Sequence, residues 1–416
     1  MTRTLSPDDL KKSSFFNNWC KKAYSLPIKD IAHRYSELTE GLDGNINFFS
    51  SPGRAELVGN HTDHNNGLVL AATIDLDTIA AVIKTPMSKE IVINSKGFPK
   101  VIVDIQDLSV KADEYGKSPA MVRGVLKGFQ ERGYKTGGFI ANTSSNIFKG
   151  AGVSSSAAFE LLICEILDVL YNQGDIDFIT KATISQFAEN HYFGKPSGLM
   201  DQLTIASGGV NYMDFQNDIP KIQKMEWPFE NMEAVIINCG GDHSDLTHEY
   251  AQIKEDMSNI AKALSADNLR QTTQEDFYQN IKELKKDWGG KAVLRAKHFY
   301  EENIRVNDAL MAIKNKEEKA FIDIINKSGT SSYEQLQNCF ISGDKEQNIP
   351  YALKMAMRYK KVKAARVHGG GFAGTILVLI EKKEEQDFVA YMKNFFGREN
   401  VFALNIRASG ATKVEV

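Results

Sequence analysis

The sequence predicts a mixed α/β (α+β) protein of two domains, and three features of the chain support this prediction. Its 416 residues, 42% of them hydrophobic, are enough to bury one or two sizeable cores. Short strand-like runs separated by turn residues fill positions 46–105, which is typical of a mixed or antiparallel sheet. Charged amphipathic helices fill positions 245–360 between two further strand-like segments, EAVIINC and KAARVHGGGFAGTILVLI. This arrangement indicates a second, α+β domain, so we expect domains over residues 1–220 and 221–416.

The individual elements follow from local patterns. The first 45 residues are polar and helical in character, ahead of the strand-like runs. After GAGVSSSAA, apolar side chains recur at helical spacing and predict a long helix with a buried stripe of Ala158, Leu162, Ile166 and Val169. The other elements are expected at these positions: helices over 121–131 and 184–193, from 198, and over 384–395, and strands over 139–142, 208–215 and 401–406.

Charge and composition exclude several classes of protein. Fifty Lys and Arg residues against 53 Asp and Glu residues give a net charge of −3, which argues against a dedicated nucleic-acid binder. No apolar run reaches the ~18 residues of a membrane helix, and the start MTRTLSPDDLKK lacks the apolar core of a secretory signal. The four cysteines are far apart, and no pair has metal-ligand or redox spacing. We therefore expect a cytoplasmic protein with reduced thiols and with neither nucleic-acid nor membrane partners.

The first candidate site segment is GAGVSSSAA, at residues 150–158. Its glycines let the backbone turn tightly and approach a ligand closely. The three serines then open a helix, whose first N–H groups lack partners within the helix and attract phosphate oxygens. Their hydroxyls can add donors to a phosphate or a ligand to Mg²⁺. The segment lacks the Lys-Ser/Thr ending of a Walker loop, and an ordinary serine-capped helix is the alternative interpretation.

Two other glycine-rich segments are SPGRAELVGNHTDHNNG at 51–67 and HGGGFAGT at 368–375. The second could line a nucleotide site or form a tight hairpin or bulge. The first crowds six polar side chains into eleven positions: Arg54, Glu56, Asn60, His61, Asp63 and His64. A zinc site would need a further ligand that the spacing does not supply, and a solvated turn is another alternative. A sugar-binding loop suits these residues better, because vicinal hydroxyls need both acceptors and donors.

The segment ENHYFGKPSGLMDQ supplies two carboxylates. Glu189 is expected on a helix, and Asp201 follows a Gly-x-Met turn. Taken alone, Asp201 could be a helix cap as well as a catalytic group.

In this order and spacing, the four segments resemble those of the galactokinases, in the GHMP superfamily of small-molecule kinases. The resemblance extends from about residue 45 to 406. It implies the two-domain GHMP kinase fold, with an N-terminal ribosomal-protein-S5-like domain, a C-terminal ferredoxin-like α+β domain and the active site in the cleft. It also implies ATP-dependent phosphorylation of the anomeric C1 hydroxyl of D-galactose, with ATP and Mg²⁺ required, sugar and ATP as the small-molecule partners, and a monomer.

The resemblance also implies roles for individual residues. Asp201 matches the carboxylate that accepts the proton of the anomeric hydroxyl, and Arg54 matches the arginine beside that hydroxyl and the transferred phosphoryl group. Ser156 and Glu189 match the positions that hold Mg²⁺. The nucleotide-binding positions are Gly150, Ala151, Gly152, Val153, Ser154, Ser155 and Ser156. The sugar-binding positions are Asn60, His61, Asp63, Gly198 and Tyr250.

The sugar loop departs from the family pattern at two positions. Where the family reads Gly-Glu-His-Thr-Asp-Tyr, this chain has GNHTDH, so Asn60 replaces the glutamate associated with the 6-hydroxyl and His64 replaces the tyrosine. A neutral Asn60 would tolerate a C6 carboxylate better than glutamate. The alternative functions are therefore a sugar 1-kinase for a related hexose, such as galacturonate or N-acetylgalactosamine, and a non-catalytic galactose sensor. The intact SSSAA run argues against the sensor.

Overall fold

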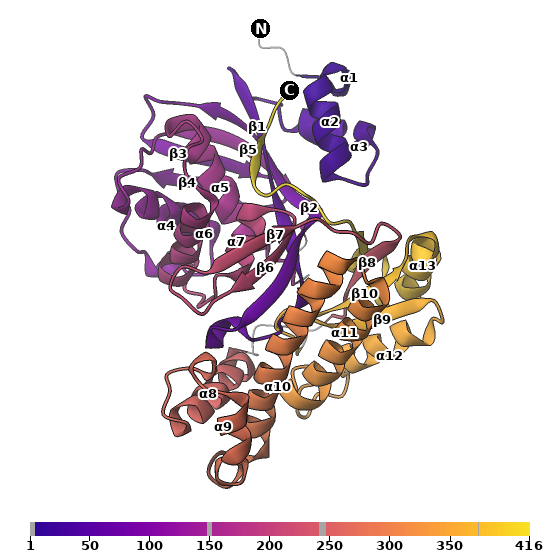
Figure 1. Ribbon diagram of the computed structural model, residues 1–416. Helices are drawn as coiled ribbons and strands as arrows, with labels where there is room; N and C mark the ends of the chain where they lie inside the picture. Colours follow the sequence, from indigo (N-terminus) through magenta and orange to yellow (C-terminus); the bar gives the residue numbers. More distant parts are fainter. Residues whose placement is uncertain (1–4, 148–151, 241–246, 373) are drawn as a thin grey trace.

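The structure, a computed structural model, describes residues 5–147, 152–240, 247–372 and 374–416. Across these residues two β-sheets, of eight and four strands, organise the chain, and helices cover them (Figure 1). The strands of the larger sheet are β1 (Ile46–Val58), β2 (Leu68–Lys84), β3 (Glu90–Ser95), β4 (Val101–Asp104), β5 (Phe139–Ser145), β6 (Val210–Asp214), β7 (Lys221–Met225) and β12 (Thr412–Val414). The strands of the smaller sheet are β8 (Met232–Asn238), β9 (Val362–His368), β10 (Thr375–Glu381) and β11 (Val401–Leu404).

The larger sheet runs in the order β12-β1-β2-β5-β3-β4, with β6 pairing with β2 and β7 pairing with β6. Its strands pair antiparallel except for β3 and β5, which confirms the predicted mixed sheet. Among the short runs predicted over residues 46–105, LVLAATI (68–74) and TIAAVI (78–83) are not separate strands but parts of one continuous strand of 17 residues, β2. This strand is apolar almost throughout because both faces of the sheet are covered.

Each face of the larger sheet has its own helices. Phe49, Ala80 and Val82 face a core shared with α4 (Ser118–Glu131), α5 (Ser155–Tyr171) and α6 (Phe178–Ala188). Their neighbours Phe48 and Ala81 face the other way, onto the N-terminal helices α1 (Pro7–Lys12), α2 (Ser14–Ala23) and α3 (Ile28–Glu37). In the predicted stripe on α5, Ala158, Leu162 and Ile166 are buried and Val169 is partly buried; the helix is in fact buried on most of its circumference.

The smaller sheet, in the order β11-β8-β10-β9, is also covered on both sides. One face packs against α12 (Asn348–Arg358) and α13 (Glu385–Phe396). The other packs against α11 (Glu318–Ser331). The long helix α10 (Ile281–Asn315) packs against α11 and against strands β1 and β2 of the larger sheet. Helix α10 bends at Gly289 and continues past α8 (Thr247–Ala263) and α9 (Gln274–Gln279), as Figure 1 shows. These contacts confirm the predicted block of helices between strands.

The chain passes from the larger sheet to the smaller one after β7 and returns to the larger sheet for its last strand. Strand β7 belongs to the larger sheet, and the last strand, β12, returns to pair with β1. The domain boundary at residue 220 stays a prediction. All four cysteines are buried and free. Within the described ranges, no helix is both long and apolar enough to cross a bilayer.

Candidate active site

Three segments that are distant in the sequence meet at the Asp201 carboxylate. Asp201 lies in the first turn of α7 (Met200–Ser207), where Arg54 of β1 donates from Nε to Oδ1 over 2.7 Å. Ser154, at the start of α5, donates from its hydroxyl to Oδ2. Neither Ser154 nor Asp201 makes a side-chain cap of its helix. The Ser154 hydroxyl and the Asp201 carboxylate therefore bind each other rather than the backbone N–H groups at the helix ends.

The electrostatics of this centre favour an ionised carboxylate. Burial alone would raise the pKa of Asp201, but the Arg54 guanidinium, the Ser154 hydroxyl and the charge of Lys195 together hold it below the usual value. An ionised carboxylate with free lone pairs can accept a proton from a hydroxyl placed beside it.

Gly152 and Val153 of the phosphate-loop segment lie against β1. The guanidinium of Arg54 donates to the Gly152 carbonyl, and the Arg54 backbone N–H donates to the Val153 carbonyl over 3.2 Å. Strand β1 continues through Gly53, where a Cβ would lie 2.8 Å from the Val153 carbonyl oxygen. Glycine is therefore required for this approach. Arg54 thus lies on a strand rather than in a solvated turn. Gly150 and Ala151 of the predicted nucleotide segment lie outside the described residues.

Glu189 is the centre of a second buried cluster, beside the first. It begins the π-helical turn Glu189–Phe193, and its side chain is 1% exposed. Four groups donate to its two oxygens: Ser156 Oγ at 2.8 Å and Lys195 Nζ at 2.9 Å to Oε1, and Ser197 Oγ and Gln202 Nε2, both at 2.7 Å, to Oε2. Ser156 and Glu189 were expected to act together, whereas the other three donors were not predicted from the sequence.

The sugar-loop residues His61 and Asp63 lie next to the other residues predicted to bind sugar. Asp63 contacts Gly198 so closely that any Cβ at position 198 would overlap its carboxylate. Burial and the charge of Asp201 raise the pKa of Asp63 to about 6. The ring of His61 lies 6.5 Å from that of Tyr250 and nearly parallel to it, and His61 Nε2 is 3.0 Å from the Gly370 carbonyl oxygen.

Asn60 is placed differently from its loop neighbours. Its side chain is completely buried, and all four of its hydrogen-bonding positions are used within the protein. Nδ2 donates to Glu56 Oε1 at 3.1 Å and to the Gly369 carbonyl at 2.6 Å, while Oδ1 accepts from Asn338 at 2.9 Å and from Ser332 at 3.2 Å. A direct contact between Asn60 and a sugar would have to replace one of these bonds.

His64 has capacity left for a ligand. Its Nδ1 is 2.9 Å from Asn65 Nδ2, while its Nε2 is buried without a hydrogen-bond partner among the described residues. Burial, with the nearby His61 and Lys254, lowers the pKa of His64 well below the usual value. The ring is therefore neutral, and Nε2 is available to a polar group of a bound molecule.

The side chains around Glu189 suit a magnesium ion. Ser156 Oγ and Glu189 Oε1 are hard oxygen ligands 2.8 Å apart, and the Lys195 ammonium already places a positive charge on the same carboxylate oxygen. One or two protein oxygens completed by phosphate and water is the usual Mg²⁺ site, whereas a cage made only of side chains is not. Consistent with this, the described ranges contain no group of three or more His, Cys, Asp or Glu residues able to hold a metal.

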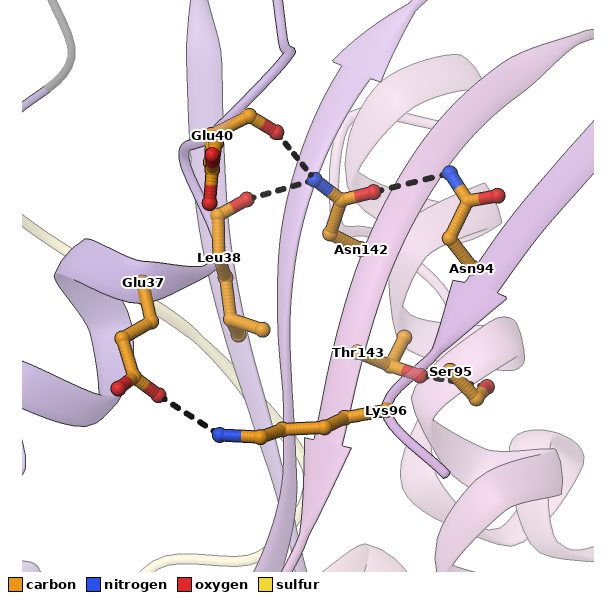
Figure 2. Close-up of a pocket in the computed structure, with 8 residues that line it drawn as sticks. All are labelled: Glu37, Leu38, Glu40, Asn94, Ser95, Lys96, Asn142 and Thr143. Carbon is orange, nitrogen blue, oxygen red and sulfur yellow. Dashed lines mark hydrogen bonds and ion pairs between the residues drawn. The ribbon is translucent and has the colours of Figure 1, made fainter. Parts of the chain in front are cut away.

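A separate groove lies between the end of α3 and the strands β3 and β5 (Figure 2). It encloses about 500 Å³ and contains none of the predicted site residues. Its polar groups are largely paired with one another: Asn94 with Asn142, and Lys96 with Glu37. The groove therefore has no part in the chemistry derived below.

Within the described residues, the structure brings most of the predicted site residues into contact. The Asp201 and Glu189 clusters share the start of α5, since Ser154 binds Asp201 and Ser156 binds Glu189. Asp63 lies near enough to these clusters for the charge of Asp201 to raise its pKa. The third glycine-rich segment is also part of the site, because Gly370 packs on the ring of Tyr250.

Comparisons with known proteins find relatives of this chain among the sugar kinases. The galactokinase galactose-binding signature matches residues 39–84, and the N-terminal domain of the GHMP kinases matches residues 120–209. The galactokinase of Fusobacterium nucleatum is 29% identical over 387 residues, which cover 89% of this chain and 96% of that protein. The galactokinase of Clostridium tetani is 28% identical over 364 residues, covering 86% and 89%.

Solved structures show the same fold. Lactococcus lactis galactokinase, crystallised with galactose, superposes with a TM-score of 0.78 at 24% identity and covers 90% of this chain and 96% of its own. Methanococcus jannaschii mevalonate kinase superposes with a TM-score of 0.63 at 17% identity, covering 88% and 99%. The predicted mixed α/β architecture is thus the one found in these kinases.

Proposed function

The chain belongs to the galactokinase family of the GHMP kinases, and from this premise we propose that it transfers the γ-phosphoryl group of ATP to the C1 hydroxyl of D-galactose. The products are galactose 1-phosphate and ADP. We further propose that it needs Mg²⁺, acts in the cytoplasm and is a monomer. Light scattering on the purified protein would test the oligomeric state.

The observation that carries the proposal is the convergence on Asp201. An arginine from the segment with the sugar loop and a serine from the phosphate-loop segment both bind this one carboxylate. A hydroxyl that reaches Asp201 is therefore next to the place where phosphate oxygens would bind. Phosphoryl transfer needs mainly this alignment and the stabilisation of charge.

Each residue then has a defined task. Asp201 accepts the proton of the C1 hydroxyl while that oxygen bonds to the γ-phosphorus and the bond to the β-phosphate oxygen breaks. Arg54 keeps Asp201 ionised and can face the transferred phosphoryl oxygens. His61, Asp63 and Tyr250 orient the sugar ring, and Gly198 leaves room for the Asp63 carboxylate. Ser156 and Glu189 would hold Mg²⁺, which when bound neutralises charge on the phosphates.

The direct test is ADP release from ATP across D-galactose, D-galacturonate, galactosamine derivatives, D-glucose and arabinose, with the phosphorylated carbon assigned by NMR. The proposal expects turnover with D-galactose and phosphate on C1. Turnover only on a sugar without the galactose configuration, or phosphate on another carbon, would reject it.

The sugar loop supports a second candidate substrate, D-galacturonate. Asn60 brings no negative charge, its amide hydrogens are already bonded to Glu56 and Gly369, and His64 Nε2 is available. A C6 carboxylate would meet less repulsion here than beside a glutamate at position 60. The comparison is kcat/KM for D-galacturonate against D-galactose, in the parent and in His64→Tyr. Strong galactose preference without detectable uronate turnover would eliminate the second candidate.

A further inference from the structure

The donors around Glu189 leave no vacant position on its carboxylate. A carboxylate offers about four acceptor sites, and Ser156, Lys195, Ser197 and Gln202 donate four hydrogen bonds to it. A metal ion can therefore bind Glu189 only if one donor leaves. Which donor leaves determines how the site is loaded.

Lys195 is the donor best able to leave. Gln202 is completely buried on α7, and Ser197 is held in place by its backbone N–H, which donates to Asn190 Oδ1 at 2.7 Å. Ser156 is the other proposed metal ligand. By contrast, the side chain of Lys195 is 56% exposed, so it can move into solvent. Lys195 also comes directly after Gly194, whose backbone has a positive φ of 81°.

The charge of Lys195 is the second reason. Its ammonium is 2.9 Å from Glu189 Oε1, the oxygen that also accepts from Ser156, and its charge acts on Asp201 and Glu160 as well. A divalent cation at the same oxygen would repel this ammonium strongly at such short distance. The ammonium and the metal ion therefore exclude each other.

We propose that Lys195 is a positioning residue that occupies the cation position on Glu189 Oε1 in the unloaded enzyme and must be displaced when the metal ion binds. This inference rests on the proposed function in so far as Ser156 and Glu189 hold the metal. With the metal absent, Lys195 keeps the buried Glu189 carboxylate compensated and in place. The cost is weaker metal binding, because the ion must compete with a charge supplied by the protein itself.

The test measures metal affinity without turnover. Mn²⁺ is titrated into the protein saturated with ADP, without sugar, and free Mn²⁺ is followed by electron paramagnetic resonance. Lys195→Met, which keeps the length of the chain and removes the charge, is expected to bind Mn²⁺ about tenfold more tightly, equivalent to 1.4 kcal/mol. Lys195→Arg retains the charge and should stay within about twofold of the parent.

Further results bear on the inference or on the proposed function. If Lys195 only held Glu189 in place, Lys195→Met would bind Mn²⁺ more weakly; that result, or an unchanged affinity, overturns it. Equal gains in Lys195→Met and Lys195→Arg would also overturn it. Lys363→Met removes an ion pair with Glu381 on the smaller sheet and should leave Mn²⁺ affinity unchanged. A parent that binds Mn²⁺–ADP but never phosphorylates D-galactose would contradict the proposed function and leave this test valid.

Discussion

Replacing Asn60 by Asp tests whether this side chain stabilises the fold through its hydrogen bonds or binds the sugar. The change is nearly isosteric, but it converts two donors into acceptors. In the parent protein, Asn60 Nδ2 donates to Glu56 Oε1 and to the Gly369 carbonyl. In the variant, a carboxylate oxygen would face these two acceptors in a fully buried position. Two lost hydrogen bonds contribute about 1 kcal/mol each, and a buried charge next to another carboxylate adds to this. We expect a loss of about 3–5 kcal/mol in the free energy of unfolding.

The assay is urea denaturation followed by circular dichroism, together with the KM for D-galactose. Asn142→Asp is the matched control, because Asn142 also uses both amide hydrogens, which it donates to the backbone carbonyls of Leu38 and Glu40 (Figure 2). That site is half-buried and open to water, so we expect a loss of about 1 kcal/mol. An Asn60→Asp protein as stable as the parent, with a raised KM for D-galactose, would show that Asn60 binds the sugar and has no structural role.

Three further predictions concern the site itself. Asp201→Asn should reduce phosphoryl transfer by at least about 100-fold while D-galactose still binds, because only the proton acceptor is lost; retained turnover would remove Asp201 from that role. Gly198→Ala should raise the KM for D-galactose about tenfold or more, since its Cβ would displace the Asp63 carboxylate; an unchanged KM would separate Asp63 from the sugar. The affinity for D-galactose, measured by calorimetry, should fall as the pH drops below 6, because the pKa of Asp63 is raised to about 6 and the sugar needs its ionised form. The free energy of unfolding should depend on pH in the opposite direction. The folded protein binds the Asp63 proton more tightly than the unfolded chain does, because the pKa of Asp63 is raised from 3.8 to about 6 on folding. The contribution of Asp63 to stability is therefore present at low pH and decreases as the pH rises from 3.8 to about 6. Asp63→Asn should remove both dependences, and a pH profile identical to that of the parent would contradict this assignment.

The sequence carried much of the fold because most elements have strong local patterns. The helical spacing of apolar residues after the glycine-serine run predicted both the helix α5 and its buried side. The fusion of two predicted strands into β2 was missed, since Asp75 and Asp77 between them resemble a turn. In the structure the Asp77 carboxylate is instead buried against Arg34 and Arg407, which come from distant parts of the chain.

The site was predictable where the residues belong to recognisable motifs, and not where contacts are created by folding alone. Lys195, Ser197 and Gln202 flank Asp201 in the sequence, but nothing local indicates that all three point at Glu189. Asn60 was expected to face the sugar on the basis of its place in the loop. Its partners Asn338 and Ser332 lie more than 270 residues away, a separation at which sequence patterns give no contact information.

The most direct measurement is a crystal structure of the protein with D-galactose and a non-hydrolysable ATP analogue. We expect the sugar's O1 within hydrogen-bond distance of Asp201, with Arg54 between that oxygen and the terminal phosphate and the serines of α5 around the phosphates. A sugar whose O1 lies away from Asp201, or terminal phosphate oxygens bound far from Arg54, would contradict it.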